Sequence, residues 1–187
     1  MDNSKPPKFW RNIRGVEYEI AYQILFAELS FDICEMIPQQ PGLGNNLLPY
    51  LYNLNFSKGV NSLHSLLVSK QPDEISLEYY FKQHQYEYKS QIDQGLLESI
   101  AELKHQFENL LDVSIRNKIT AHTDLKFAHT DFTSAYMLPS KLPEIKSIIV
   151  KLKKVFFEDT NHSLTDDPMW KIRKQAEIII DYLVKNP

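Results

Sequence analysis

Arginine and histidine stand six residues apart in the stretch Ser114–Asp124, which reads S-I-R-N-K-I-T-A-H-T-D. Arg116 carries a permanently charged, planar guanidinium that matches phosphate oxygens. His122 is a histidine, the residue type whose ordinary pKa suits proton transfer in both directions near neutral pH. Asn117, directly after the arginine, can orient either side chain or donate a hydrogen bond to the same phosphate. These residue types in this order predict chemistry on a phosphate.

The element that must position these residues is a helix that ends near them. Ile115 and Ile119 continue an apolar stripe that begins near Ile92. On an ideal helix, His122 points within about 20° of Ile115, whereas Arg116 points about 100° to one side. The two side chains therefore converge only if the helix ends or bends before His122, or if a second subunit completes the site. The alternative is structural, because a helix-terminal arginine interacts well with the helix dipole and a terminal histidine caps free carbonyl groups.

The segment R-N-K-I-T-A-H-T-D resembles the R-x(4–6)-H signature of the HEPN superfamily, in which a polar residue commonly follows the arginine. It is especially similar to the branch associated with abortive-infection phage defence, where Ser or Thr and then Asp follow the histidine. The resemblance implies Arg116 and His122 as catalytic residues and Asn117 as an auxiliary one. It also implies a helical homodimer that cleaves RNA without a metal or other cofactor, often as a toxin controlled by an antitoxin or regulatory protein. Some members have lost activity or serve as assembly modules, so a non-catalytic dimeric binding module is the alternative.

A second pattern overlaps the first, because the tetrapeptide A-H-T-D occurs at 121–124 and again at 128–131. His122, Asp124, His129 and Asp131 are residue types that bind transition metals. A metal-dependent hydrolase therefore stays open as a further alternative. A zinc site needs converging ligands, however, and a seven-residue offset in a loop does not guarantee them. We expect no metal site here.

Composition limits the classes of protein that fit this chain. The 187 residues, 43% hydrophobic and 24% charged, suit one globular domain, and only five glycines argue against β-rich and nucleotide-loop architectures. Cys34 is the only cysteine, which excludes an internal disulfide, and we expect it to be a small buried hydrophobic residue. No apolar run is long enough to span a membrane, so we expect a soluble, cytoplasmic protein. The net charge of −3 restricts any RNA contact to local clusters of lysine and arginine.

Apolar periodicity predicts an all-α bundle of five or six helices, HEPN-like by the resemblance. We expect residues 1–14 to form a polar, basic N-terminal segment and residues 15–187 to form a single helical domain. The predicted helices are 16–37, 46–68, 75–90 with continuation into 91–121, 142–157 and 168–185. Asp167 is the predicted cap of the last helix, which we expect to bury Trp170, Ile172, Ile178, Ile179, Tyr182 and Leu183.

The function predicted from the motif and the resemblance is metal-independent cleavage of RNA at a dimer cleft. His122 would take the proton of a ribose 2′-hydroxyl, Arg116 would stabilise the charge on the phosphoryl oxygens, and Asn117 would help to position them. One histidine does not easily act as both base and acid, so a two-fold dimer would supply the second proton carrier.

Overall fold

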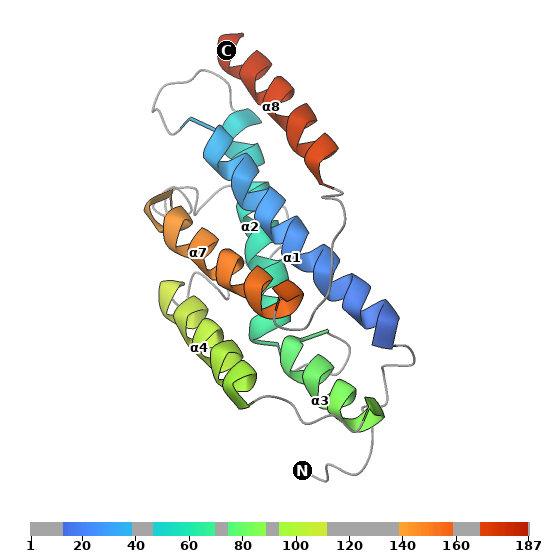
Figure 1. Ribbon diagram of the computed structural model, residues 1–187. Coiled ribbons are helices and arrows are strands. Elements are labelled where there is room, and N and C mark those ends of the chain that lie inside the picture. The colour runs from blue at the N-terminus through green and yellow to red at the C-terminus, as the bar shows by residue number, and fades with distance from the viewer. Residues whose placement is uncertain are drawn as a thin grey trace.

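Six α-helices make up most of the described part of this computed structural model, which comprises residues 13–38, 47–69, 75–88, 94–111, 139–158 and 169–186 (Figure 1). They are α1 (Ile13–Met36), α2 (Leu47–Leu67), α3 (Leu77–Tyr88), α4 (Gln94–Leu110), α7 (Leu142–Lys153) and α8 (Trp170–Lys185). A short 3-10 turn at Pro139–Lys141 precedes α7, and a π-helical turn at Lys154–Glu158 follows it. No strand occurs in these ranges. The prediction of an all-α bundle of five or six helices is confirmed.

The helix boundaries differ from the predicted ones in three places. α1 begins at Ile13 and so includes residues 13 and 14 of the predicted N-terminal segment, while residues 1–12 lie outside the described part. α3 and α4 are two separate helices rather than one continuing helix, and α4 is described only as far as Leu110. α8 has Met169, not Asp167, at its N-cap position, and no side chain caps it.

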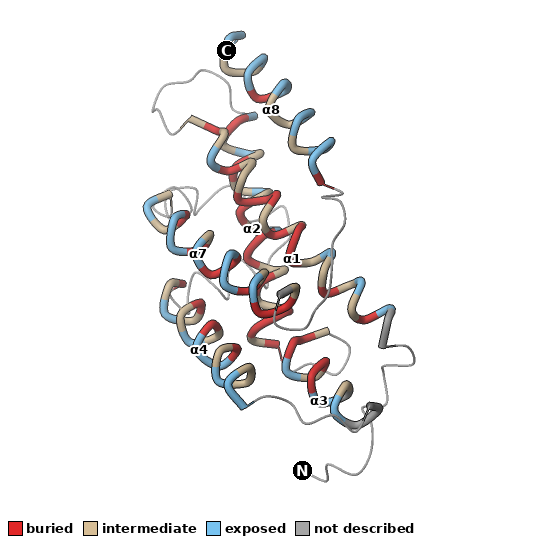
Figure 2. The backbone as a smooth tube through the Cα atoms, in the orientation of Figure 1, coloured by how far each residue is buried: buried red, intermediate tan, exposed pale blue. Residues whose placement is uncertain are grey.

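The centre of the bundle is an antiparallel pair formed by α1 and α2. Phe31 of α1 contacts Phe56 of α2 edge to face, with ring centroids 5.6 Å apart. Closer to the N-terminal end of α2, Cys34 Sγ donates a hydrogen bond to the carbonyl oxygen of Tyr52 at 3.5 Å. Gly59 allows the close approach, because a Cβ there would lie 2.6 Å from the Phe31 ring. All five residues are buried, so this interface is the main apolar core (Figure 2).

α7, α4 and α3 surround this pair. The apolar spacing of residues 142–157 predicts one inward face along α7 and the π-helical turn that follows it. This face is confirmed, since all of its residues are buried: Leu142, Ile145, Ile148, Ile149, Leu152, Val155 and Phe156. Ile100, Leu103 and Phe107 form the buried face of α4, which packs on α7. The rings of Tyr80 in α3 and Phe156 pack together with their centroids 5.8 Å apart. The Tyr80 hydroxyl donates a hydrogen bond to Glu17 Oε1 of α1 at 3.0 Å.

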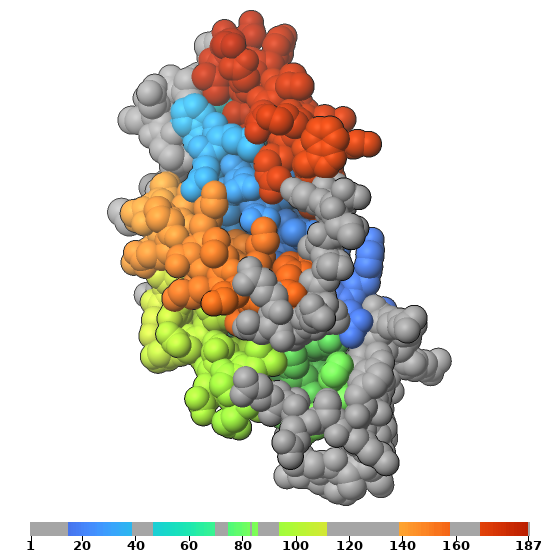
Figure 3. All heavy atoms as spheres, viewed as in Figure 1, coloured from blue at the N-terminus to red at the C-terminus, as the bar shows by residue number. Residues whose placement is uncertain are grey.

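α8 contradicts the predicted burial of its apolar residues. Five of the six expected core residues are exposed: Trp170 (54%), Ile172 (48%), Ile178 (69%), Ile179 (56%) and Tyr182 (65%). α1 is the main neighbour of α8, so one narrow face of the helix is covered and Ile180 is its one buried residue. Figure 3 shows α8 as an outer layer at one end of the molecule.

Two smaller corrections concern α1 and α2. Apolar spacing predicts that Leu47 and Leu54 of α2 and Tyr22 of α1 face the core, but all three are exposed. Leu48 and Tyr52 take the buried positions on α2 instead. Within the described ranges, none of the helices is both long and apolar enough to cross a bilayer.

Candidate functional site

The predicted catalytic residues Arg116, Asn117 and His122 lie outside the residues that the structure describes, and so do the two A-H-T-D segments. The structure does describe the helix from which they follow. α4 ends at Leu110, and Leu111 after it is buried with 1% of its surface exposed. The chain therefore enters the predicted catalytic stretch from a point fixed in the apolar core.

α4 is a firm support because it is amphipathic and packed against a second helix. Ile100, Leu103 and Phe107 recur at spacings of three and four, which places them on one face, and that face is buried. On its outer side, Lys151 Nζ of α7 donates to Gln106 Oε1 at 3.0 Å. This packing fixes the helix that leads to Arg116, which comes six residues after the helix ends at Leu110.

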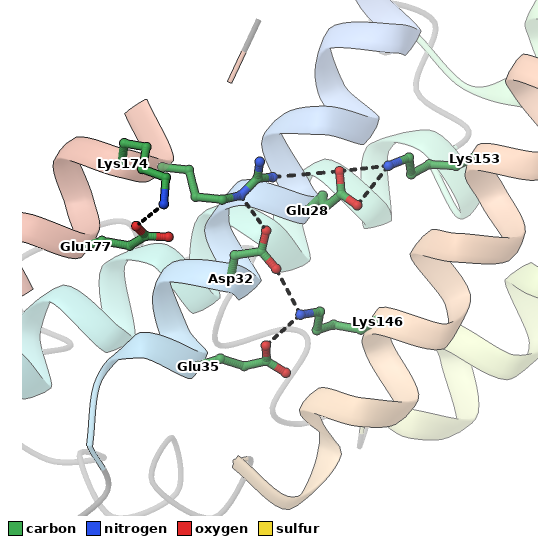
Figure 4. A network of polar contacts seen from close by, with 8 residues as sticks. Glu28, Asp32, Glu35, Lys146, Lys153, Lys174 and Glu177 are labelled. Atoms are coloured by element: carbon green, nitrogen blue, oxygen red, sulfur yellow. Dashed lines mark hydrogen bonds and ion pairs between the residues drawn. The ribbon is translucent and has the colours of Figure 1, made fainter. Parts of the chain in front are cut away.

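The described residues contain one cluster of charged side chains between helices. Spacings of four and three residues place Glu28, Asp32 and Glu35 on one side of α1. Lys146 Nζ of α7 lies 2.9 Å from Asp32 Oδ1 and 2.5 Å from Glu35 Oε2 (Figure 4). Lys153 Nζ, one heptad further along α7, lies 2.9 Å from Glu28 Oε1. The later lysine of α7 pairs with the earlier carboxylate of α1, so the two helices run antiparallel.

Arg173 of α8 completes this cluster. Its Nε donates to Asp32 Oδ2 at 2.9 Å, and its Nη2 lies 4.0 Å from Glu28 Oε2. Glu28, Asp32, Glu35, Lys146, Lys153 and Arg173 are called the ion-pair network below. It contains three carboxylates and three cations, so its formal charges balance.

Electrostatics favour a structural role for the ion-pair network. Partial burial acts to lower the pKa of Lys146, but hydrogen bonds and charge attraction from Glu35 and Asp32 outweigh it, and the pKa is raised above 10.5. Lys146 thus stays protonated at neutral pH and does not act as a base. The arrangement joins three helices, α1, α7 and α8.

The network changes how the basic clusters of the sequence are interpreted. Lys146 and Lys153 of α7 and Arg173 of α8 are paired with α1, so they are not free to meet phosphate. Lys154 and Lys171 remain on exposed positions. No sequence prediction included this network, although the acidic spacing on α1 and the seven-residue spacing of Lys146 and Lys153 were the available signals.

Metal ligands do not cluster in the part of the chain that is described: no group of three or more His, Cys, Asp or Glu there could hold an ion. His105 is exposed and within 3.0 Å of the Asn109 amide, and His84 contacts the Tyr80 ring. The A-H-T-D segments are not among the residues that this result covers.

Comparison with known proteins adds no relative: no protein-family model matches the chain, and neither does any curated protein or solved structure. The likeness of residues 116–124 to the HEPN signature therefore rests on the sequence motif alone.

Proposed function

We propose that this protein is a metal-independent endoribonuclease of the toxin or phage-defence type. The observation that carries the proposal is the pattern R-N-K-I-T-A-H-T-D, which pairs a permanent cation with a titratable imidazole and a polar amide. Its position supports the proposal too, because it follows closely on α4, a helix whose inner face is packed in the core. The all-helical architecture is compatible with a HEPN-like bundle.

In the proposed reaction, His122 accepts the proton of a ribose 2′-hydroxyl as that oxygen attacks the adjacent phosphorus. The bond from phosphorus to the 5′-oxygen breaks, which leaves a 2′,3′-cyclic phosphate and a 5′-hydroxyl. Arg116 stabilises the negative charge on the phosphoryl oxygens, and Asn117 positions them. The 5′-oxygen takes its proton from a second carrier, which the proposal assigns to His122 of a second copy in a homodimer.

The expected size of each contribution makes the proposal testable. General acid–base catalysis by a histidine is worth about 10²–10⁴-fold in rate. A positioned charge donor such as Arg116 is worth about 10²–10³-fold. In the presence of EDTA, we expect the wild-type protein to cleave single-stranded RNA, and His122→Ala and Arg116→Ala each to lose activity by at least about 100-fold.

His129→Ala is the matched control, because His129 occupies the equivalent position in the second A-H-T-D segment. It should cleave like wild type, and the products should carry 2′,3′-cyclic phosphate ends. Cleavage that EDTA abolishes and that needs both His122 and His129 would instead indicate the metal-dependent hydrolase. Full activity of His122→Ala in EDTA would refute the role assigned to His122.

A non-catalytic, dimeric binding or assembly module is the second candidate. Two observations favour it: the exposed apolar residues of α8, and the pairing of Lys146, Lys153 and Arg173 inside the protein. The first is typical of surfaces that bind proteins, and the second leaves fewer cations for RNA. Wild-type protein with no nuclease activity, together with a large loss of stability in His122→Ala, would support this candidate.

A further inference from the structure

α8 is attached to the bundle by few apolar contacts. Ile180 is the one buried residue within its 16 residues, whereas eight residues of α2 are buried. Leu183 and Val184 pack against the same core but are only partly buried, and Met169, just before the helix, packs on Leu25 and Leu29 of α1. Helices in proteins owe most of their stability to packing, and segments with few buried contacts open at the lowest free energy. By this criterion, α8 is the described helix most ready to open.

Arg173 is the charged anchor of α8 on α1. Its side chain is 23% exposed and that of Asp32 17% exposed, so the 2.9 Å hydrogen bond between them is partly shielded from water. The other described ion pairs of α8, Lys174 with Glu177 and Lys185 with Asp181, lie within the helix itself. Arg173 is therefore the side chain through which electrostatics hold α8 in place.

The α7 lysines give both carboxylates of this anchor a second partner. Asp32 Oδ1 also forms an ion pair with Lys146 Nζ at 2.9 Å, and Glu28 Oε1 forms one with Lys153 Nζ at 2.9 Å (Figure 4). Breaking a buried pair is normally costly because it leaves one charge buried without a partner. Here the departure of Arg173 leaves neither Asp32 nor Glu28 alone, and the guanidinium passes into water.

We propose that α8 is a detachable arm, which leaves α1 as a unit while the rest of the bundle stays folded. Arg173 sets how often the arm opens, and Lys146 and Lys153 keep the carboxylates of α1 satisfied when it does. This device is independent of the proposed nuclease function.

Opening would uncover a continuous apolar stripe on α1. Tyr18 and Tyr22 are already 74% and 44% exposed, and Leu25 and Leu29 follow them at spacings of three and four residues. Leu25 and Leu29 are buried under Met169 while α8 is docked. The closed arm thus hides half of a stripe whose other half is already on the surface.

Hydrogen exchange of the full chain, followed by mass spectrometry, tests the arm. We expect the amides of α8 to exchange faster than those of α1 and α2, because α8 opens without them. Arg173→Met should raise the opening constant of α8 by about threefold to tenfold, since it removes a charged, partly shielded hydrogen bond. Lys174→Met is the matched control, because Lys174 pairs only within α8 in the described contacts, and its effect should stay below about twofold.

Lys146→Met should change the opening constant of α8 in the opposite direction to Arg173→Met. Asp32 then depends on Arg173 alone, so opening would leave a carboxylate unpaired and α8 should open less often than in wild type. A Cys34 labelling rate that stays at the wild-type value in Arg173→Met would show that the α1–α2 core remains closed, because Cys34 is buried there.

Three results would overturn the proposal. α8 could be as well protected as α1 and α2, which would mean that it opens only when the whole protein unfolds. Arg173→Met could match Lys174→Met, which would remove Arg173 as the anchor. Lys146→Met could loosen α8, which would contradict the role of the α7 lysines as second partners.

Discussion

Cys34 lies between α1 and α2 with 1% of its surface exposed, and its Sγ donates to the Tyr52 carbonyl oxygen at 3.5 Å. Burial raises the pKa of the thiol, and the nearby carboxylate of Glu35 raises it further. Since the thiolate is the reactive form, both effects suppress its chemistry. The expectation of a small buried hydrophobic residue is confirmed.

Labelling of Cys34 should therefore report unfolding. In native buffer we expect the thiol to react with a disulfide reagent only as fast as the α1–α2 interface opens, and the rate to rise with denaturant in step with global unfolding. The chain has a single cysteine, so one equivalent of label in the unfolded protein provides the control. Rapid, stoichiometric labelling of the native protein would contradict the burial described here.

At the scale of helices, the contact of Gly59 with Phe31 decides how closely α1 and α2 approach. A Cβ on Gly59 would lie 2.6 Å from Phe31 Cε2 and 2.7 Å from Phe31 Cζ. Phe31 is fully buried and its ring also meets Phe56, so it has little room to move away. Glycine in a helix is otherwise a disadvantage of about 1 kcal/mol relative to alanine.

Gly59→Ala should consequently destabilise the protein, although alanine is the better helix former. Overpacking of a core costs about 1–3 kcal/mol, and after the gain of about 1 kcal/mol in helix propensity we expect a net loss of about 1 kcal/mol. Denaturant unfolding measures it. Gly95→Ala, at an exposed position of α4, should cause no loss, and Phe31→Leu should recover part of the loss in the Gly59→Ala background. Equal stability of Gly59→Ala and wild type would show that the helices separate easily.

At the same scale, α7 and α8 show where periodicity succeeds and fails. Both carry apolar residues at helical spacing, and on α7 all of the predicted residues are buried. α7 lies between α1 and α4, so its apolar face is covered, whereas α8 has α1 as its main neighbour. Spacing shows which face of a helix is apolar but does not show how many neighbours cover it.

For the molecule as a whole, the ion-pair network joins α1 to two helices that are distant in sequence. Lys146 is its central cation, and attraction to Glu35 and Asp32 leaves its pKa raised above 10.5 in spite of partial burial. A raised lysine pKa means that folding favours the protonated form. The stabilisation is therefore complete below about pH 10.5 and is lost as the pH rises through the higher, folded-state pKa.

Lys146→Met should show this dependence directly. We expect it to lower the free energy of unfolding by about 1–2 kcal/mol at pH 7, a value discounted for the partial exposure of the pairs. The difference from wild type should stay constant from about pH 7 to 9 and shrink above about pH 10.5. Lys171→Met, which removes an exposed lysine outside the network, should show no such trend. If the difference in the free energy of unfolding stayed constant into strongly alkaline solution, the stabilisation would not depend on protonation of Lys146.

By itself, the sequence determined the all-helical class, the approximate limits of most helices, the buried face of α7 and the burial of Cys34. Each of these depends on local spacing or on residue type, and both can be read directly from the amino-acid sequence. The sequence also selected Arg116, Asn117 and His122 as the candidate catalytic residues, and that prediction awaits the nuclease test.

Only the tertiary structure decided which charges meet and which apolar residues remain exposed. Glu28 and Lys153 lie 125 residues apart, and their pairing follows from the antiparallel packing of α1 and α7. Ile178 and Ile179 look like core residues in the sequence, yet they are exposed because α8 packs mainly on a single neighbour. Both outcomes depend on contacts between helices, and a pattern within one helix carries no information about its partners.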